Sequence, residues 1–284
     1  MKKYLILVLL ILPVVFSGFH TPQADLKVFI SVDMEGLAGV VSGSECGSGP
    51  DYNYFREIMT LETNAAIEGA INAGATEIVV RDGHGGKTNI FPGILHPKAK
   101  LLRGNSGHIK NMMDGIDDTF DALMFIGYHA KAGTPNGILA HTSTGNVIDF
   151  SVNGVSLPEA GYNALIAGMY DVPVVFLAGD RAICEQAKEL FGDIELVETK
   201  IGIGKAELGL HPKVVRELVR EGVSKALRNL DKYKPYKLQP PYRMMLQVRS
   251  EKPPYPGAEK IEQGTFSYTS SDMLKIIDAF NKMK

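Results

Sequence analysis

The sequence predicts an α/β fold in which a mixed, mainly parallel sheet is flanked by helices, with a smaller α+β unit at the C-terminal end. Apolar runs of strand length alternate along the chain with amphipathic stretches of helical length, the pattern of a sheet covered by helices. The composition, 45% apolar and 22% charged, is close to the globular average, so 284 residues suffice for one large domain or two modest ones. The net charge of -2, with scattered lysines and arginines, makes nucleic acid an unexpected partner.

Residues 1–24 have the pattern of a signal peptide followed by a short leader. Two lysines follow Met1, an apolar run covers 4–16, and the small residues Ser17 and Gly18 come next. The apolar run is shorter than the roughly 20 residues that a spanning helix needs, so no stable membrane span is expected after cleavage. We therefore expect an exported protein, periplasmic or secreted, with an uncleaved N-terminal anchor as the alternative.

Residues 25–208 are expected to form an α/β catalytic domain that binds metal. The pattern predicts its main elements, which are strands at 26–30, 76–81, 122–128 and 172–178 and helices at 54–73, 159–170 and 181–191. Gly74 is expected to end the first of these helices, and Asp180 is expected to cap the third.

A tight hairpin is predicted in the middle of the chain. The pair Asn153-Gly154, a signal for a two-residue turn, lies between short apolar runs at 147–152 and 155–157. Because a hairpin makes its two strands antiparallel, we expect the sheet to be mixed.

Residues 209–284 are expected to form the smaller C-terminal unit. Its predicted elements are a charged amphipathic helix at 212–230, a linker rich in Pro and Tyr at 233–241, strands at 244–249 and 265–269, and a closing helix at 272–283. The two cysteines, Cys46 and Cys184, are too few for a disulfide framework and are not spaced like zinc ligands, so both are interpreted as incidental.

Two carboxylates follow the first predicted strand. Asp33 and Glu35 lie two positions apart, so an extended chain presents both on the same side at the strand end. Two adjacent anions favour a cation between them. A solvated loop entrance is the ordinary alternative for such a pair.

Three further metal-ligand side chains occupy similar places. His84 follows the strand at 76–81 in a glycine-rich loop, His129 follows the strand at 122–128, and Glu159 opens a helix. Side chains at the ends of sheet strands are fixed by a rigid scaffold and open to substrate, which favours a shared metal site. Each also has an ordinary explanation, since an exposed loop histidine, a backbone-bonded histidine and a helix-opening carboxylate are all common.

Two residues near these ligands have open roles. His141 follows a short apolar stretch and is either a metal ligand or the acid/base group. Asp82, two residues before His84, is expected to accept a hydrogen bond that orients the imidazole. The other four histidines lie near turns or chain junctions and are not taken as ligands; they are His20, His96, His108 and His211.

These residues, in this order, resemble the DppA-type zinc D-aminopeptidase family. The motifs that carry the resemblance are Ser31 to Gly36, Asp82-x-His84, Gly127-Tyr128-His129-Ala130, His141, Glu159-x-Gly161-x-Asn163-Ala164, and the segments at 170–174 and 178–180. The similarity runs from about Lys27 to the C-terminal helix, and the combination is far more specific than any single motif.

The resemblance implies a two-zinc site with Asp33, Glu35, His84, His129 and Glu159 as ligands. Asp33 is implied to bridge the two ions, and His141 matches the family's catalytic histidine. The resemblance also implies removal of an N-terminal D-residue from short peptides by a metal-bound hydroxide. It further implies a ring-shaped homo-oligomer, with a decamer as the expected count.

The chemistry of such a site suits amide hydrolysis. Three carboxylates leave two zinc ions with net positive charge, and zinc lowers the pKa of bound water from about 15.7 toward 7. Two other interpretations stay open. One is a metal hydrolase that acts on another amide or on a phosphoester, because similar two-metal sites serve both chemistries. The other is an exported solute-binding protein in which the same side chains only hold a ligand.

Overall fold

A seven-stranded sheet forms the centre of the protein. The computed structural model describes Met1 and residues 25–284, so the expected signal peptide and leader lie, apart from Met1, outside the described residues. In spatial order the strands are β3 (Ala99–Leu102), β2 (Ala75–Asp82), β1 (Leu26–Val32), β4 (Ala122–Tyr128), β7 (Val174–Asp180), β8 (Glu195–Ile203) and β9 (Ala206–Gly209). All neighbouring pairs are parallel except β8 and β9. The predicted α/β fold with a mixed, mainly parallel sheet is therefore confirmed.

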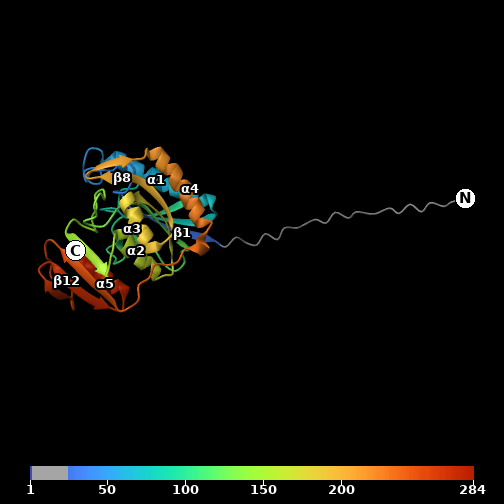
Figure 1. Ribbon diagram of the computed structural model, residues 1–284. Coiled ribbons are helices and arrows are strands. Elements are labelled where there is room, and N and C mark those ends of the chain that lie inside the picture. Colours follow the sequence, from blue (N-terminus) through green and yellow to red (C-terminus); the bar gives the residue numbers. More distant parts are fainter. Residues whose placement is uncertain (2–24) are drawn as a thin grey trace.

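Helices cover both faces of this sheet (Figure 1). Helices α1 (Tyr52–Asn72) and α4 (Pro212–Leu227) pack against each other on one face. Helices α2 (Glu159–Gly168) and α3 (Arg181–Phe191) lie on the other face. The chain crosses from β1 to β2 in one direction along the sheet and from β4 to β7 and β8 in the other. Right-handed crossovers that run in opposite directions place their helices on opposite faces. The predicted cap of α3 is present, because the Asp180 carboxylate accepts a hydrogen bond from the backbone N–H of Ile183 at 3.1 Å.

A second, antiparallel sheet carries the C-terminal helix. Its order is β11 (Glu259–Glu262), β12 (Thr265–Ser270), β10 (Tyr242–Val248), β5 (Val147–Val152) and β6 (Val155–Ser156), and α5 (Met273–Met283) packs on it. The predicted hairpin joins β5 to β6, with positive φ angles at Asn153 and Gly154. It lies in this second sheet, however, and the antiparallel strand of the central sheet is β9 instead.

The division of the chain at residue 209 stays a prediction. Helix α4, which follows that position, packs on α1 and β8 of the central sheet. Strands β5 and β6, which precede it, pair within the sheet that contains β10 and β12.

Two short 3-10 helices, at Asn111–Met113 and Leu230–Lys232, complete the elements of the described residues. In the described part of the chain, no helix is both long and apolar enough to cross a membrane.

The carboxyl ends of β1 and β4 meet at the point where the strand order reverses. From β1 the chain moves outward to β2 and β3, and from β4 it moves the other way to β7 and β8. In open α/β sheets, ligands bind outside the carboxyl ends of the strands at such a point.

Two glycines let these ends approach closely. The Gly36 N–H donates to the Gly127 carbonyl at 2.8 Å. A Cβ on Gly36 would lie 1.8 Å from the Tyr128 carbonyl oxygen, and a Cβ on Gly127 would lie 2.3 Å from the Asp33 carbonyl oxygen. Both positions therefore exclude a side chain. The two strand ends are therefore in backbone contact beside Asp33, Glu35 and His129, which the sequence analysis selected as metal ligands.

Candidate metal centre

Asp33 and Glu35 leave the end of β1 and are almost completely buried, with 2% and 6% of their surfaces exposed. The Asp33 N–H donates to the Ile126 carbonyl of β4 at 2.8 Å, which fixes the strand end. The buried ammonium of Lys200 on β8 donates to the backbone carbonyl of Glu35 at 2.6 Å, so the following turn is fixed as well. Both carboxylates are thus held by backbone contacts that leave their side chains free to face the cavity.

The imidazole of His84, from the loop after β2, faces both carboxylates. Its Nδ1 lies 3.0 Å from Asp33 Oδ1 and 3.1 Å from Glu35 Oε2. Its Nε2–H donates to the Cys46 carbonyl at 2.8 Å, which fixes the orientation of the ring. Cys46 therefore contributes through its backbone, and both cysteines are free thiols.

Asp82 does not orient His84, so that prediction is wrong. Its carboxylate instead accepts hydrogen bonds from the backbone N–H groups of Asn89 and Ile90, at 2.6 and 2.8 Å, and from the Asn89 side chain at 2.7 Å. Asp82 thereby holds the loop that carries His84, because the loop folds back onto the end of β2.

His129 and Glu159 approach Asp33 from the opposite side. His129 Nε2 lies 3.6 Å from Asp33 Oδ2 and 3.5 Å from Glu159 Oε1, while its Nδ1–H donates to the Ala130 carbonyl at 3.0 Å. Glu159, at the first position of α2, accepts a hydrogen bond from the Ser143 N–H at 2.6 Å. The buried Nε2 of His129 has no hydrogen-bond partner among the described residues, which is unfavourable unless another group meets it.

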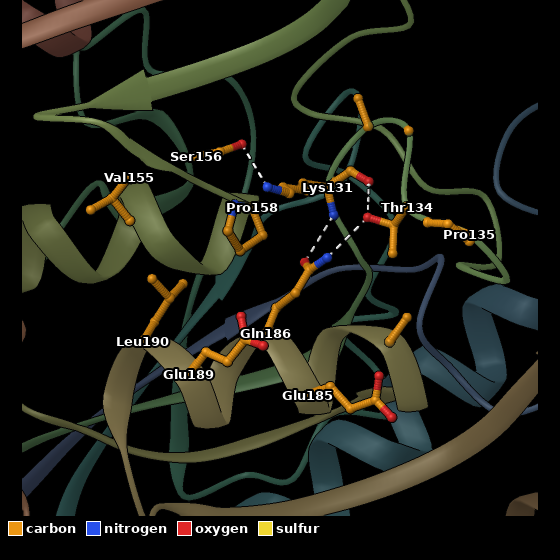
Figure 2. A pocket seen from close by; sticks show the side chains of 13 residues that line it. Lys131, Thr134, Pro135, Val155, Ser156, Pro158, Glu185, Gln186, Glu189 and Leu190 are labelled. Atoms are coloured by element: carbon orange, nitrogen blue, oxygen red, sulfur yellow. Dashed lines mark hydrogen bonds between the residues drawn. The ribbon is translucent and has the colours of Figure 1, made fainter.

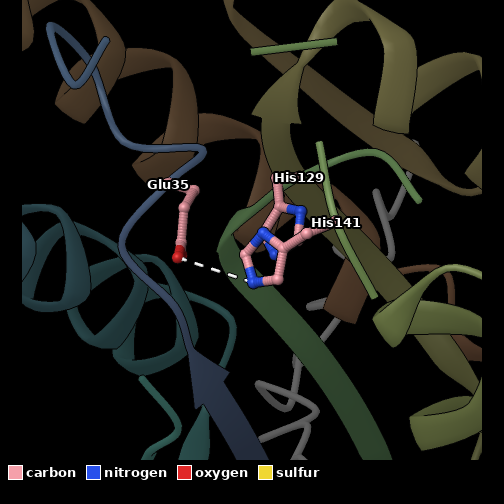
Figure 3. Close-up of side chains that lie close together, drawn as sticks. All are labelled: Glu35, His129 and His141. Carbon is pink, nitrogen blue, oxygen red and sulfur yellow. Dashed lines mark ion pairs between the residues drawn. The ribbon is translucent and has the colours of Figure 1, made fainter. Parts of the chain in front are cut away.

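His141 lies beside His129 and faces Glu35 (Figure 3). Its Nδ1–H donates to the Leu139 carbonyl at 2.8 Å, and its Nε2 lies 3.9 Å from Glu35 Oε1 and 3.6 Å from Glu159 Oε1. In all three histidines, one ring nitrogen is held by a backbone carbonyl and the other points toward the carboxylates. That arrangement is typical of metal-binding imidazoles.

The structure brings all six predicted site residues together. Three groups of potential ligand atoms lie within 4.8 Å of one another, namely Asp33 with Glu35 and His84, Asp33 with His129 and Glu159, and Glu35 with His129 and His141. Nitrogen and carboxylate oxygen donors in sets of three suit zinc with an open position. The first two groups share Asp33, so the geometry fits two neighbouring ions.

The buried charges stabilise one another strongly. Burial disfavours the charged form of His84, but Glu35 and Asp33 outweigh burial and raise its pKa to about 11. In His129, burial is likewise outweighed by Glu159, Glu35 and Asp33, and the pKa rises to about 10. Burial opposes ionisation of Glu35, but His84, His129 and His141 hold its pKa well below the usual range. Because ligand imidazoles must be deprotonated, a metal ion held by these residues would displace protons from them.

Five of the six residues line a cavity of about 270 Å³, and His129 lies buried behind them. Two other lining residues are lysines that no sequence pattern marked as site residues. These are Lys87, in the loop after His84, and Lys284, directly after α5. Burial lowers the pKa of the Lys284 ammonium to about 8. No local motif marks Lys284, because it reaches the cavity only through the packing of α5.

A larger cavity, of about 620 Å³, lies between α3 and the loop after β4 (Figure 2). Its polar groups bind one another: Lys131 Nζ donates to Ser156 Oγ at 2.7 Å, and the Gln186 side chain donates to Thr134 Oγ1 at 2.9 Å. Its lining contains no histidine. The candidate metal ligands therefore lie at the smaller cavity.

Comparison with known proteins agrees with this site. The family model described as D-aminopeptidase, peptidase family M55, matches residues 26–282. A D-aminopeptidase of Bacillus subtilis (strain 168) is 39% identical over 227 residues, which cover 78% of this chain and 81% of the relative. The solved structure of the Zn-dependent D-aminopeptidase DppA from Bacillus subtilis, described as a self-compartmentalizing protease, matches with a TM-score of 0.85 and 34% identity. That match covers 90% of this chain and 96% of the other.

The prediction of an exported protein is contradicted by the structural comparison. The matched enzyme is a self-compartmentalizing protease. Such an enzyme separates its active sites from surrounding polypeptides by its own assembly, which is needed where it shares a compartment with proteins that it must not cleave. The prediction rested on residues that lie, apart from Met1, outside the described part of the chain. Export is therefore withdrawn.

The resemblance inferred from the motifs is confirmed, and a solute-binding protein is excluded. The family model spans nearly all of the described chain, and both relatives named above are D-aminopeptidases. The chain belongs to the D-aminopeptidase family, peptidase family M55, and is an enzyme of the zinc-dependent D-aminopeptidase class.

Proposed function

We propose that this enzyme binds two zinc ions and hydrolyses the N-terminal peptide bond of short peptides that begin with a D-residue. Asp33, Glu35 and His84 would hold one ion, and Asp33, His129 and Glu159 the other. The observation that carries the proposal is that these two ligand groups share Asp33, whose two oxygens face opposite sides: Oδ1 lies 3.0 Å from His84 and Oδ2 lies 3.6 Å from His129.

The donor set supports two divalent ions. Three buried carboxylates cannot balance the four positive charges of two zinc ions, so the centre would stay electrophilic. Among the described residues, neither Nε2 of His129 nor Oε2 of Glu35 has a hydrogen-bond partner, although His84 Nδ1 lies 3.1 Å from the Glu35 oxygen; two bound ions would satisfy both ligand atoms. Bound zinc would supply a water of strongly lowered pKa and would polarise the scissile carbonyl.

The residues of the chain would position the substrate and move the proton. His141 would carry a proton on Nε2 to the leaving amine, because its Nδ1–H is already bound to the Leu139 carbonyl. The hydrogen bond from Ser143 to Glu159 would keep that carboxylate oriented while the reaction proceeds. His141 is also the most exposed of the three imidazoles, with 28% of its side chain accessible, as contact with a substrate requires.

We also propose that the protein assembles into a homo-oligomer, with a ring of ten subunits as the expected form. The matched DppA is self-compartmentalizing, and here apolar side chains are exposed on the β8–β9 hairpin and on or beside α4: Ile203, Leu208, Leu210, Val214 and Leu218. Apolar patches of this kind favour contact with another protein surface. Light scattering coupled to size exclusion would report the mass; a monomer would contradict this proposal.

The activity is tested with matched substrates and metal states. Purified protein with zinc is offered D-alanyl and L-alanyl dipeptides and an aryl phosphate, with and without a chelator, and its zinc content is measured. We expect about two zinc ions per chain and cleavage of the D-peptide that the chelator abolishes. Phosphate release without peptide cleavage, or cleavage that survives complete metal removal, would contradict the proposal.

A further inference from the structure

Lys284, directly after α5, lies in the wall of the cavity at the candidate metal centre. Lys284 Nζ donates to Ser143 Oγ at 2.5 Å and to Asn281 Oδ1 at 2.8 Å, and its side chain lines the cavity together with Lys87. One residue, Ser143, thus links the ammonium to the metal side of the cavity, because the Ser143 N–H donates to Glu159 Oε1 at 2.6 Å.

Packing of α5 fixes this position. The ring of Phe280 stacks on that of Phe150 in β5 with centroids 4.0 Å apart, and the Asn281 side chain donates to the Ile109 carbonyl at 3.0 Å. The helix end is therefore held by an aromatic contact to one sheet and by a hydrogen bond to a loop beside the other. A lysine placed by these contacts is oriented before any substrate arrives.

The ammonium of Lys284 can donate one more hydrogen bond. An ammonium has three N–H groups, and two of them meet the neutral oxygens of Ser143 and Asn281. Within the described residues, no carboxylate lies within 4.0 Å of it. Lys87 is 8% exposed, donates to the Gly83 carbonyl, and likewise has no carboxylate within that distance in the described chain. Lys87 is buried and Lys284 is half-buried, and cations withdrawn from water without an anionic partner are unfavourable, so this wall of the cavity suits an incoming anion.

We propose that Lys284, supported by Lys87, binds the C-terminal carboxylate of a very short peptide whose amino end and scissile bond lie at the carboxylate and imidazole wall. This inference rests on the proposed peptidase function. The cavity of about 270 Å³ holds both the lysines and the carboxylates Asp33, Glu35 and Glu159, so a very short peptide can reach from one wall to the other. Lys284 would thus fix the position of the carboxyl end of the substrate.

The test compares one dipeptide in two forms. D-Ala-D-Ala with a free carboxylate and its C-terminal amide share every feature except the charge that Lys284 would bind. We expect the zinc-loaded parent to prefer the acid by roughly tenfold to a hundredfold in kcat/KM, the scale of a hydrogen bond to a charged group. Lys284→Met should remove this preference by raising KM for the acid alone, with zinc content unchanged. Lys284→Arg should keep it, and so should Lys275→Met, which alters an exposed lysine of α5.

The outcomes separate this inference from the proposed function. If the parent cleaves acid and amide equally well, or if Lys284→Met keeps the preference of the parent, the role of Lys284 is overturned while the peptidase function stands. If the parent cleaves neither form with zinc bound, the proposed function fails and this inference fails with it.

Discussion

The imidazole rings of His129 and His141 stack with centroids 4.1 Å apart and planes inclined by only 15°. The Nε2 atoms of both face the same oxygen of Glu159, at 3.5 and 3.6 Å. They differ in surroundings, because His129 is fully buried and also faces Asp33, whereas 28% of the His141 side chain is accessible. The stacked pair therefore places a proposed metal ligand against a proposed proton carrier.

Replacing each histidine should separate these roles. His141→Ala should retain both zinc ions but lower kcat for a D-dipeptide by at least about a hundredfold, the usual scale for a positioned acid/base. His129→Ala should instead lose one zinc ion. Metal analysis and kinetics on the same preparations check both expectations. Loss of zinc in His141→Ala would make it a ligand, and unchanged turnover would remove it from the mechanism.

Gly36→Ala should disturb the site without touching a ligand. The added Cβ would lie 1.8 Å from the Tyr128 carbonyl, so the ends of β1 and β4 would have to separate. We expect a loss of about 1–3 kcal/mol in the free energy of unfolding, the usual cost of overpacking, and reduced zinc occupancy. Gly43→Ala is the matched control, because nothing lies within 4 Å of the Cβ it would add. Equal stability and zinc content in the two variants would refute this account.

Glu62 should make stability depend on pH. Burial in α1 raises the pKa of its carboxyl from 4.5 to about 7. Between these pH values the folded state binds more protons than the unfolded state, so Glu62 lowers stability progressively as pH rises from 4.5 to 7, and no further above that. Glu62→Gln keeps the oxygen that accepts the hydrogen bond from the Ala38 N–H, and it removes the free-energy cost of ionising a buried carboxyl. Urea unfolding should show the variant gaining at most about 3 kcal/mol over the parent at pH 8, and nothing at pH 4. A gain that is the same at both pH values would argue against a buried, titrating Glu62.

Lys200 should stabilise the turn that carries Glu35. Its ammonium is 1% exposed and donates to the carbonyls of Glu35, Leu37 and Val40. Lys200→Met would leave the carbonyls of Glu35 and Val40 unsatisfied at a cost of about 1–3 kcal/mol each, while the Leu37 carbonyl still accepts from the Val40 N–H at 3.4 Å. We expect a loss of about 2 kcal/mol or more in the free energy of unfolding, and easier removal of zinc by a chelator. Lys205→Met, at an exposed position of the same hairpin, should change neither quantity.

The positions of the candidate ligand residues could be predicted because they depend on local patterns. Asp33, His84 and His129 each follow a recognisable apolar strand, and parallel strands in one sheet bring their carboxyl ends to the same edge. The cap at Asp180 was predictable for the same reason, since a capping side chain acts on the turn that follows it.

Features that depend on distant contacts were not predictable. Strands β8 and β9 carry charged residues among apolar ones, so no clear alternation marks them. The role of Asp82 depends on a loop that returns seven residues later, and the place of Lys284 depends on the packing of α5. The hairpin at Asn153 was visible in the sequence, but the sheet that it joins was not.

Anomalous X-ray scattering at the zinc edge, from crystals of the zinc-loaded protein, tests the central claim most directly. Two peaks per chain are expected, one between Asp33, Glu35 and His84 and the other between Asp33, His129 and Glu159. A single peak in the cavity, or zinc bound away from Asp33, would contradict the two-ion centre.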